Sequence, residues 1–81
     1  MDYFRDIIKI LIIIKELQPT NQSGIHRKTG ITYSHILKQL HILKKYDLIT
    51  ITKRGREQII TLTRKGMNTT DNLLLAMENL R

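Results

Sequence analysis

Apolar residues follow a helical period over most of the chain and a strand-like alternation over one stretch. The first apolar segment, from Tyr3 to Leu17, predicts a helix with Asp2 as its N-cap and Pro19 just beyond its end. Its leucines and isoleucines occupy too many helical angles for a single stripe, which indicates burial on more than one side. Because the chain has only 81 residues, the additional side predicts a contact with a second subunit.

Two shorter helices are predicted next to each other in the sequence. The first of them is capped by Thr20 or Asn21 and ends at Gly30, because glycine is the usual left-handed stop of a helix. The second is capped by Thr32 and runs to about Tyr46. A connection of three or four residues that contains a glycine is the signature of a helix-turn-helix.

After Asp47 the pattern changes to a short alternation that is rich in isoleucine and threonine. Two strands, 48–52 and 57–63, flank the sequence KRGR and predict a hairpin with Gly55 at its turn. Thr63 then caps a last helix that extends to about Leu80. The expected fold class is mainly α with a β-hairpin (α+β), in the order helix, helix, helix, strand, strand, helix.

The chain is expected to form one domain, residues 1–81. Residues 1–18 form the first helix, 20–46 the helix-turn-helix, 48–63 the hairpin and 64–81 the last helix. The last helix has apolar residues with few partners in its own subunit: Met67, Leu73, Leu74, Leu75, Met77 and Leu80. A homodimer built from the first and last helices is therefore predicted.

Positive charge is concentrated in the middle of the chain. The formal net charge is +7. Residues 26–66 hold ten basic side chains against two acidic ones, whereas 1–25 has three of each and 67–81 has one basic and two acidic. This clustering is typical of a protein that binds a polyanion, although a charged surface also keeps a small protein soluble.

The helix after Thr32 has two different faces. Ile36, Leu40 and Leu43 fall on one side with Tyr33 beside them, and they predict a buried stripe. The opposite, exposed face is formed by these residues: Ser34, Lys38, His41 and Lys45, with His35 on its flank. No acidic residue lies on that face, so the Glu–Lys pairs that stabilise a solvated helix are missing. DNA phosphates would supply the negative charge.

The start of this helix is expected to contact bases and its end to contact the backbone. The residues assigned to DNA there are Thr32, Tyr33, Ser34, His35, Lys38, His41 and Lys45. Lys38 can donate to guanine, and Gln39, toward the edge of the buried side, has the amide that suits adenine. Lys53, Arg54 and Arg56 surround Gly55 at the hairpin tip. A basic hairpin after a helix-turn-helix is expected to lie on the backbone or in the minor groove.

The segment GIHRKTGITYSHILKQLHILKKYDLITI, followed by TKRGREQIITLTRKG, resembles a winged helix-turn-helix DNA-binding domain. It is similar to MarR-like and other small dimeric regulators of bacteria, archaea and archaeal viruses. The resemblance covers about residues 21–66 and is most specific at 30–32, 43–49 and 62–66. It implies a transcription regulator that binds a two-fold-related site on double-stranded DNA as a homodimer. One departure is Asp47, which stands where a glycine is usual before the wing.

No catalytic residue, metal site or cofactor is predicted. The acidic residues are scattered, and no glycine-rich phosphate loop follows a strand. His26, His35 and His41 do not have the i, i+4 spacing of a helical metal pair. No apolar segment approaches the ~20 residues that span a bilayer, so a cytoplasmic protein without a membrane partner is expected.

Alternatives to a specific regulator stay open at the level of the sequence. The same charge pattern suits a general, chromatin-like DNA binder. A winged helix can also serve as a protein–protein interaction module, although such a module needs no basic wing. RNA binding is a further alternative, but the chain has few aromatic side chains for stacking on bases.

Overall fold

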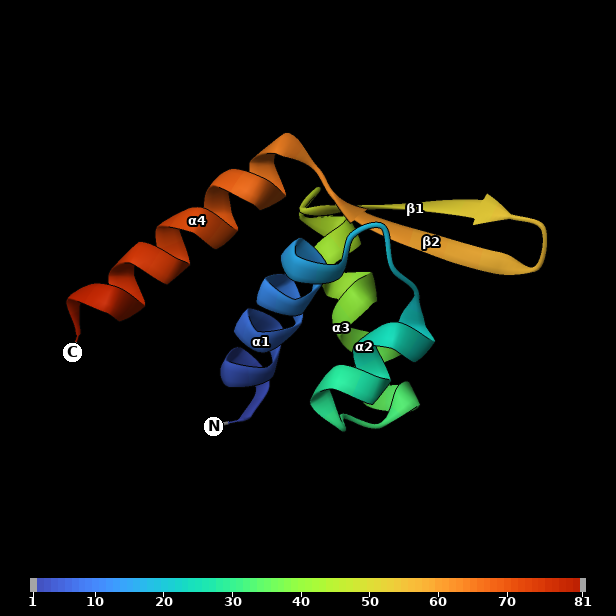
Figure 1. Cartoon of the computed structure of the whole chain (residues 1–81), viewed down its shortest axis with the longest axis horizontal. Coiled ribbons are helices and arrows are strands. Elements are labelled where there is room, and N and C mark those ends of the chain that lie inside the picture. The colour runs from blue at the N-terminus through green and yellow to red at the C-terminus, as the bar shows by residue number, and fades with distance from the viewer. Residues whose placement is uncertain (1, 81) are drawn as a thin grey trace.

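The computed structural model describes the backbone of residues 2–80 and the side chains of residues 4–80. Over that range the order is α1 (Asp2–Leu17), α2 (Gln22–Thr29), α3 (Tyr33–Lys45), β1 (Ile49–Arg54), β2 (Glu57–Leu62) and α4 (Arg64–Asn79). The helices α1, α2 and α3 cluster together, the hairpin projects to one side and α4 runs away on the other side (Figure 1). The predicted α+β class and element order are confirmed. The N-cap role predicted for Asp2 falls on a side chain outside the described ones.

One hydrophobic core joins the first three helices to the base of the hairpin. Its buried members are Ile10, Leu11, Ile14, Ile25, Ile36, Leu40, Leu43, Ile49 and Ile60. Full burial of each such side chain stabilises the fold by about 1.5–3 kcal/mol. The stripe predicted for α3 is confirmed for its two leucines and for Ile36. The prediction that Tyr33 is also buried in this stripe is wrong, because its side chain is 47% exposed.

The helix-turn-helix is defined by local capping contacts. Asn21 is the N-cap of α2, and its side-chain oxygen accepts a hydrogen bond from the backbone N–H of Gly24 at 2.8 Å. Gly30 ends α2 with φ of 72°. Thr32 caps α3 by accepting a hydrogen bond from the N–H of His35 at 3.4 Å. These contacts confirm the predicted helix boundaries, and they decide between the two candidate caps of α2.

Thr20, the other candidate cap, pairs with the hairpin. Its N–H donates to the carbonyl of Ile60 at 3.1 Å, and its own carbonyl accepts from the N–H of Ile60 at 2.7 Å. Sequence analysis did not predict this bridge. It fixes the segment after α1 to the free edge of β2, so the hairpin is attached to the helical core on both sides.

The hairpin is antiparallel and has a two-residue turn. Its register pairs Ile49 with Leu62 at the base and Arg54 with Glu57 at the tip. Gly55 lies in the turn with φ of 64°, as the sequence predicts. Asp47, which precedes β1, also has a positive φ, of 61°. Asparagine and aspartate tolerate this left-handed conformation better than most side chains, which explains how Asp47 replaces the glycine usual there.

The start of α4 is anchored to the turn before β1. Thr63 caps α4, and its hydroxyl donates to the carbonyl of Asp47 at 2.7 Å. The N–H of Thr63 donates to the carbonyl of Leu48 at 3.1 Å. Gly66 and Thr70 are buried, and Leu73 packs against the core. Contrary to expectation, the first half of α4 therefore has extensive partners within its own subunit.

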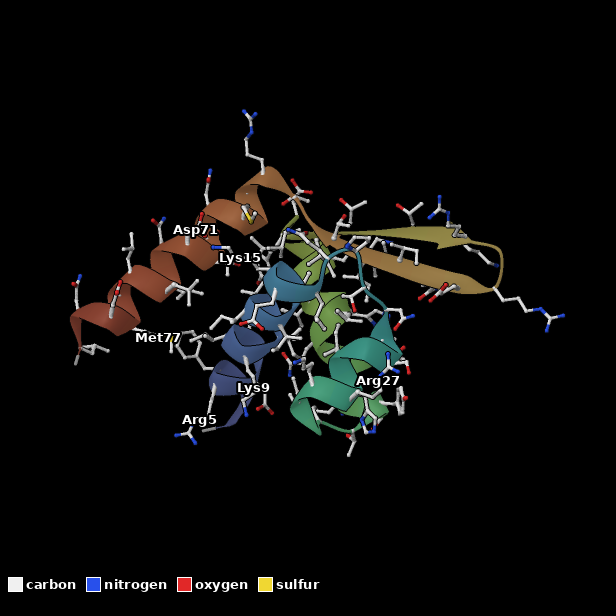
Figure 2. The ribbon with its side chains drawn as sticks, viewed as in Figure 1. Arg5, Lys9, Lys15, Arg27, Asp71 and Met77 are labelled. Carbon is white, nitrogen blue, oxygen red and sulfur yellow. The ribbon has the colours of Figure 1, made fainter. Side chains whose placement is uncertain are left out.

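The second half of α4 diverges from α1, and an apolar groove lies between them. Leu75 and Met77 are exposed on α4, and Leu80 is exposed just after its end. The groove has a volume of about 500 Å³ and is lined by Phe4, Arg5, Ile8, Lys9, Ile12 and Met77. Figure 2 shows Arg5, Lys9 and Met77 around it, with the Lys15–Asp71 ion pair where the two helices meet.

No helix within residues 2–80 is long and apolar enough to cross a membrane.

Candidate nucleic-acid interface

The exposed face of α3 carries the polar residues that the sequence assigned to it. Ser34, Lys38, His41 and Lys45 are all exposed, and the α-helical period brings them to one side. No acidic side chain occurs between Tyr33 and Lys45. This face is therefore a row of hydrogen-bond donors whose positive charge is not neutralised by an acidic side chain of α3.

Tyr33 lies at the start of α3 and is held by α2. Its ring stacks on that of His26, with centroids 4.3 Å apart and an angle of 26° between the planes. Its hydroxyl lies 3.5 Å from the hydroxyl of Ser23, and its carbonyl accepts from the side chain of Gln22 at 2.9 Å. The helical period predicted a buried Tyr33, and this is wrong because the first turn of α3 extends beyond the core. The ring is exposed yet fixed in orientation.

His35 has a contact that the sequence did not predict. Its Nε2 atom lies 2.9 Å from Oδ2 of Asp6 on α1, and the two side chains are 28% and 19% exposed. Gln39, one turn further along α3, is fully buried. The expectation that Gln39 faces adenine is therefore wrong. A base contact of His35 stays a prediction, and it would require this side chain to leave Asp6.

The tip of the hairpin is basic and exposed. Lys53, Arg54 and Arg56 surround Gly55, and all of them are exposed. Glu57, the acidic residue nearest to them in sequence, accepts a hydrogen bond from the Asn21 side chain at the start of α2. The carboxylate is thereby drawn toward the helices. Sequence analysis missed this contact because Asn21 and Glu57 are far apart in the chain.

The lysines of α3 and the cations of the hairpin tip have no acidic partners among the side chains that the structure describes. Among the described side chains, ion pairs form only between Lys15 and Asp71 and between His35 and Asp6. The basic residues outside these pairs include Lys38, Lys45, Lys53, Arg54 and Arg56. Within residues 4–80, no group of three or more histidine or acidic side chains is arranged to hold a metal ion. The chemistry available at this surface is therefore hydrogen-bond donation and attraction of anions.

Several solved structures with the same arrangement are transcription regulators. Staphylococcus aureus MarR, in complex with salicylate and kanamycin, is 29% identical over 93% of this chain and 52% of its own, with a TM-score of 0.85. The chain is a MarR-like winged helix. The transcriptional repressor CouR, bound to a 23-mer DNA duplex, is 25% identical to this winged helix over 80% of it and 48% of CouR, with a TM-score of 0.75.

A protein of Archaeoglobus fulgidus has nearly the same length as this winged helix. It matches 93% of this chain and 86% of its own with a TM-score of 0.81, and at 17% identity it shows the fold alone. By contrast, the winged helix spans about half the length of MarR and CouR. No protein-family model and no curated protein matches the sequence.

Proposed function

We propose that this winged helix binds double-stranded DNA as a homodimeric transcription regulator. The observation that carries the proposal is the acid-free, exposed face of α3 beside a hairpin tip whose cations have no acidic partners among the side chains of residues 4–80. The likeness to CouR supports it, because that repressor is bound to a DNA duplex. In this proposal 20–46 is the DNA-binding helix-turn-helix, 48–63 the wing, and 1–18 and 64–81 the dimerisation helices of a single domain. Such a protein acts in the cytoplasm without a cofactor.

In the proposal α3 enters the major groove, which is wide enough to admit a helix. Its N-terminal end, with Tyr33, Ser34 and Lys38, contacts base edges. His41 and Lys45, one and two turns further along, contact the backbone. Thr32 uses its side-chain oxygen to cap α3, so its role is to fix the start of the helix against the DNA. The stack on His26 orients the Tyr33 hydroxyl before binding, which reduces the entropy lost on association.

The wing contributes affinity rather than base selection. Lys53, Arg54 and Arg56 lie at the end of a hairpin that extends away from the helices (Figure 1). Side chains at such a tip reach phosphates or the minor groove, where the potential is strongly negative. The hydrogen bond from Asn21 to Glu57 ties the tip end of β2 to the start of α2. The wing and α3 therefore meet DNA with a fixed relative orientation.

Dimerisation would use the groove between α1 and α4. Phe4 is 66% exposed and Met77 is 46% exposed, although both are large apolar side chains. In an 81-residue chain, covering these side chains with a second copy adds apolar burial that the small core cannot supply. The matching faces of the two copies would meet about a two-fold axis. Dimer symmetry then predicts a DNA site with two related halves.

The experiment that tests the proposal is selection of bound sequences from random duplexes at physiological salt. A regulator is expected to enrich one motif with two related halves. Enrichment of no motif, together with tight binding, would instead identify a general chromatin-like binder. Absence of DNA binding would reject the proposal and favour a protein–protein interaction module.

Replacement of Lys38 by alanine is expected to relax the base preference at one position of each half-site. The expected cost is about 1–3 kcal/mol for the base that the lysine contacts, since that contact discriminates among base pairs. Competition binding with duplexes substituted at each position measures the change. Arg54→Ala is the matched control, because loss of a wing cation should weaken binding to every duplex equally. A change of preference in Arg54→Ala with none in Lys38→Ala would contradict this division of roles.

Replacement of Met77 by glutamate is expected to convert the dimer to a monomer. The new charge would be buried without a partner in the proposed interface, and the penalty for such a charge is several kcal/mol. Light scattering over a range of protein concentrations measures the mass. Asn72→Glu, on an exposed polar position of the same helix, should stay dimeric. A Met77→Glu protein of unchanged mass would remove this part of α4 from the interface.

A further inference from the structure

Leu37 is an exposed aliphatic residue among the polar residues of α3. It is 43% exposed, whereas Leu40 and Leu43 of the same helix are buried. A single exposed leucine is common on protein surfaces and by itself indicates no function. The neighbours of Leu37 on the helix surface are what make its exposure informative.

Most of these neighbours are residues assigned to DNA. Residues three and four positions apart adjoin each other on the surface of an α-helix. Those that adjoin Leu37 are Tyr33, Ser34, Leu40 and His41. Leu40 is buried in the core, whereas the other three are exposed. A DNA duplex bound to these three residues would therefore also cover Leu37 and remove its side chain from water.

The major groove offers one apolar group for such a side chain, the C5-methyl group of thymine. The other groups that distinguish the bases there are hydrogen-bond donors and acceptors. Leucine can pair with none of them, so a polar base edge covered by Leu37 would lose its water without gaining a partner, which is unfavourable. Contact with a thymine methyl group instead buries two apolar surfaces together, which is favourable.

Leu37 also lies in the part of α3 that is proposed to enter the groove. It is one turn beyond the start of the helix at Tyr33 and directly precedes Lys38. The α-helical period places it about 60° from Ser34 and about 40° from His41. Ile42 is a second exposed aliphatic residue of α3, at 37%. It lies about 140° from Leu37 around the helix, in the half proposed to contact the DNA backbone.

We propose that Leu37 contacts a thymine methyl group in each half of the DNA site and is a specificity-determining residue of this winged helix. This inference rests on the proposed DNA-binding function. The donors of α3 contact hydrogen-bonding groups of the bases, whereas Leu37 recognises thymine by its methyl group. Cytosine in the same place has no methyl group and presents an amino group to the leucine instead. The selected motif is therefore expected to contain a thymine in each half-site.

The test is replacement of single thymines of the selected motif by uracil, which removes the methyl group and keeps the hydrogen-bonding groups of the base. With the wild type, one such replacement in a half-site is expected to weaken binding about threefold to fivefold, the effect of one buried methyl group. With Leu37→Ala the same replacement should have no effect, because the methyl group has lost its partner. Fluorescence anisotropy with both proteins and both duplexes measures this coupling.

Two further variants serve as controls. Leu37→Met should keep most of the uracil effect, because its side chain is apolar and of similar volume. Ile42→Ala is the matched control, since it removes an exposed aliphatic side chain outside the proposed base contacts, and it should keep the full uracil effect. Alanine is a good helix former, so both alanine variants are expected to fold, and circular dichroism establishes this.

Three results would overturn the inference. They are a selected motif without thymine, a wild type that is insensitive to uracil at every thymine, and a uracil effect that persists in Leu37→Ala. Loss of the effect in Ile42→Ala as well would assign it to the helix as a whole and would also overturn the role of Leu37. A wild type that binds no duplex would instead reject the proposed function. If the wild type selects a motif and no uracil effect depends on Leu37, only the inference about Leu37 fails.

Discussion

Raising the salt concentration from 50 to 200 mM is expected to weaken DNA binding by about 10³- to 10⁴-fold. The cations on the exposed face of α3 and at the hairpin tip have no acidic partners in the described part of the chain, so phosphates are their natural counterions. If each protomer neutralises roughly five to eight phosphates, log affinity falls with log salt at a slope of about −5 to −7. Fluorescence anisotropy with a labelled duplex at several salt concentrations measures the slope.

Replacement of single cations by alanine provides the control for the slope of log affinity against log salt. Arg54→Ala should reduce its magnitude by about one, because one phosphate contact is lost. Arg64→Ala removes an exposed cation at the start of α4, outside the exposed face of α3 and the hairpin tip, and should leave the slope unchanged. A flat salt response of the wild type would reject DNA binding through this surface, since phosphate contacts always release counterions.

The parts of the fold that the sequence predicted are those set by local chemistry. Gly30 marks the end of α2 because its φ of 72° favours a residue without a side chain. Thr32 and Thr63 mark helix starts because their hydroxyls accept hydrogen bonds from the first turn. Each of these signals involves residues at most three or four apart, so they can be recognised without knowledge of the packing.

The parts that could not be predicted depend on which element lies opposite a given side chain. A helical wheel gives the angle of His35 but not the presence of Asp6 beside it. It gives the angle of Gln39, at the edge of the stripe, but not that this edge is fully buried. The exposure of side chains on α3 was therefore predicted best around Lys38 and worst at the flank toward α1.

Asp47 and Gly66 are two positions where the sequence shows an unusual or family-like residue but not the structural reason for it. The sequence marks Asp47 as unusual, and its positive φ gives the reason. Gly66 was recognised only as part of the family pattern. Its role becomes clear from packing, because a Cβ atom added at Gly66 would lie 1.9 Å from the carbonyl oxygen of Leu48. The start of α4 thus passes directly over the turn that leads into β1.

Replacement of Gly66 by alanine is expected to destabilise the fold by about 3–5 kcal/mol, a large part of the stability of a small domain. Leu48 cannot move away cheaply, because its N–H donates to Leu43 at 2.9 Å and its carbonyl accepts from Thr63 at 3.1 Å. Helix propensity alone would favour alanine over glycine by about 1 kcal/mol. A lower free energy of unfolding would therefore indicate a clash with Leu48, whereas a higher one would indicate the effect of helix propensity. Urea unfolding followed by circular dichroism measures it.

Gly55→Ala is the control for this prediction, because the two glycines are constrained for different reasons. At Gly55 an added Cβ atom meets nothing within 4 Å, but φ is +64°, so alanine should cost only about 1–2 kcal/mol of backbone strain. Gly66 lies in a helix, and its penalty comes entirely from contact with Leu48. A Gly66→Ala protein at least as stable as the wild type would show that the turn before β1 has room to move. In that case α4 would be less firmly attached to the DNA-binding part of the chain than these contacts indicate.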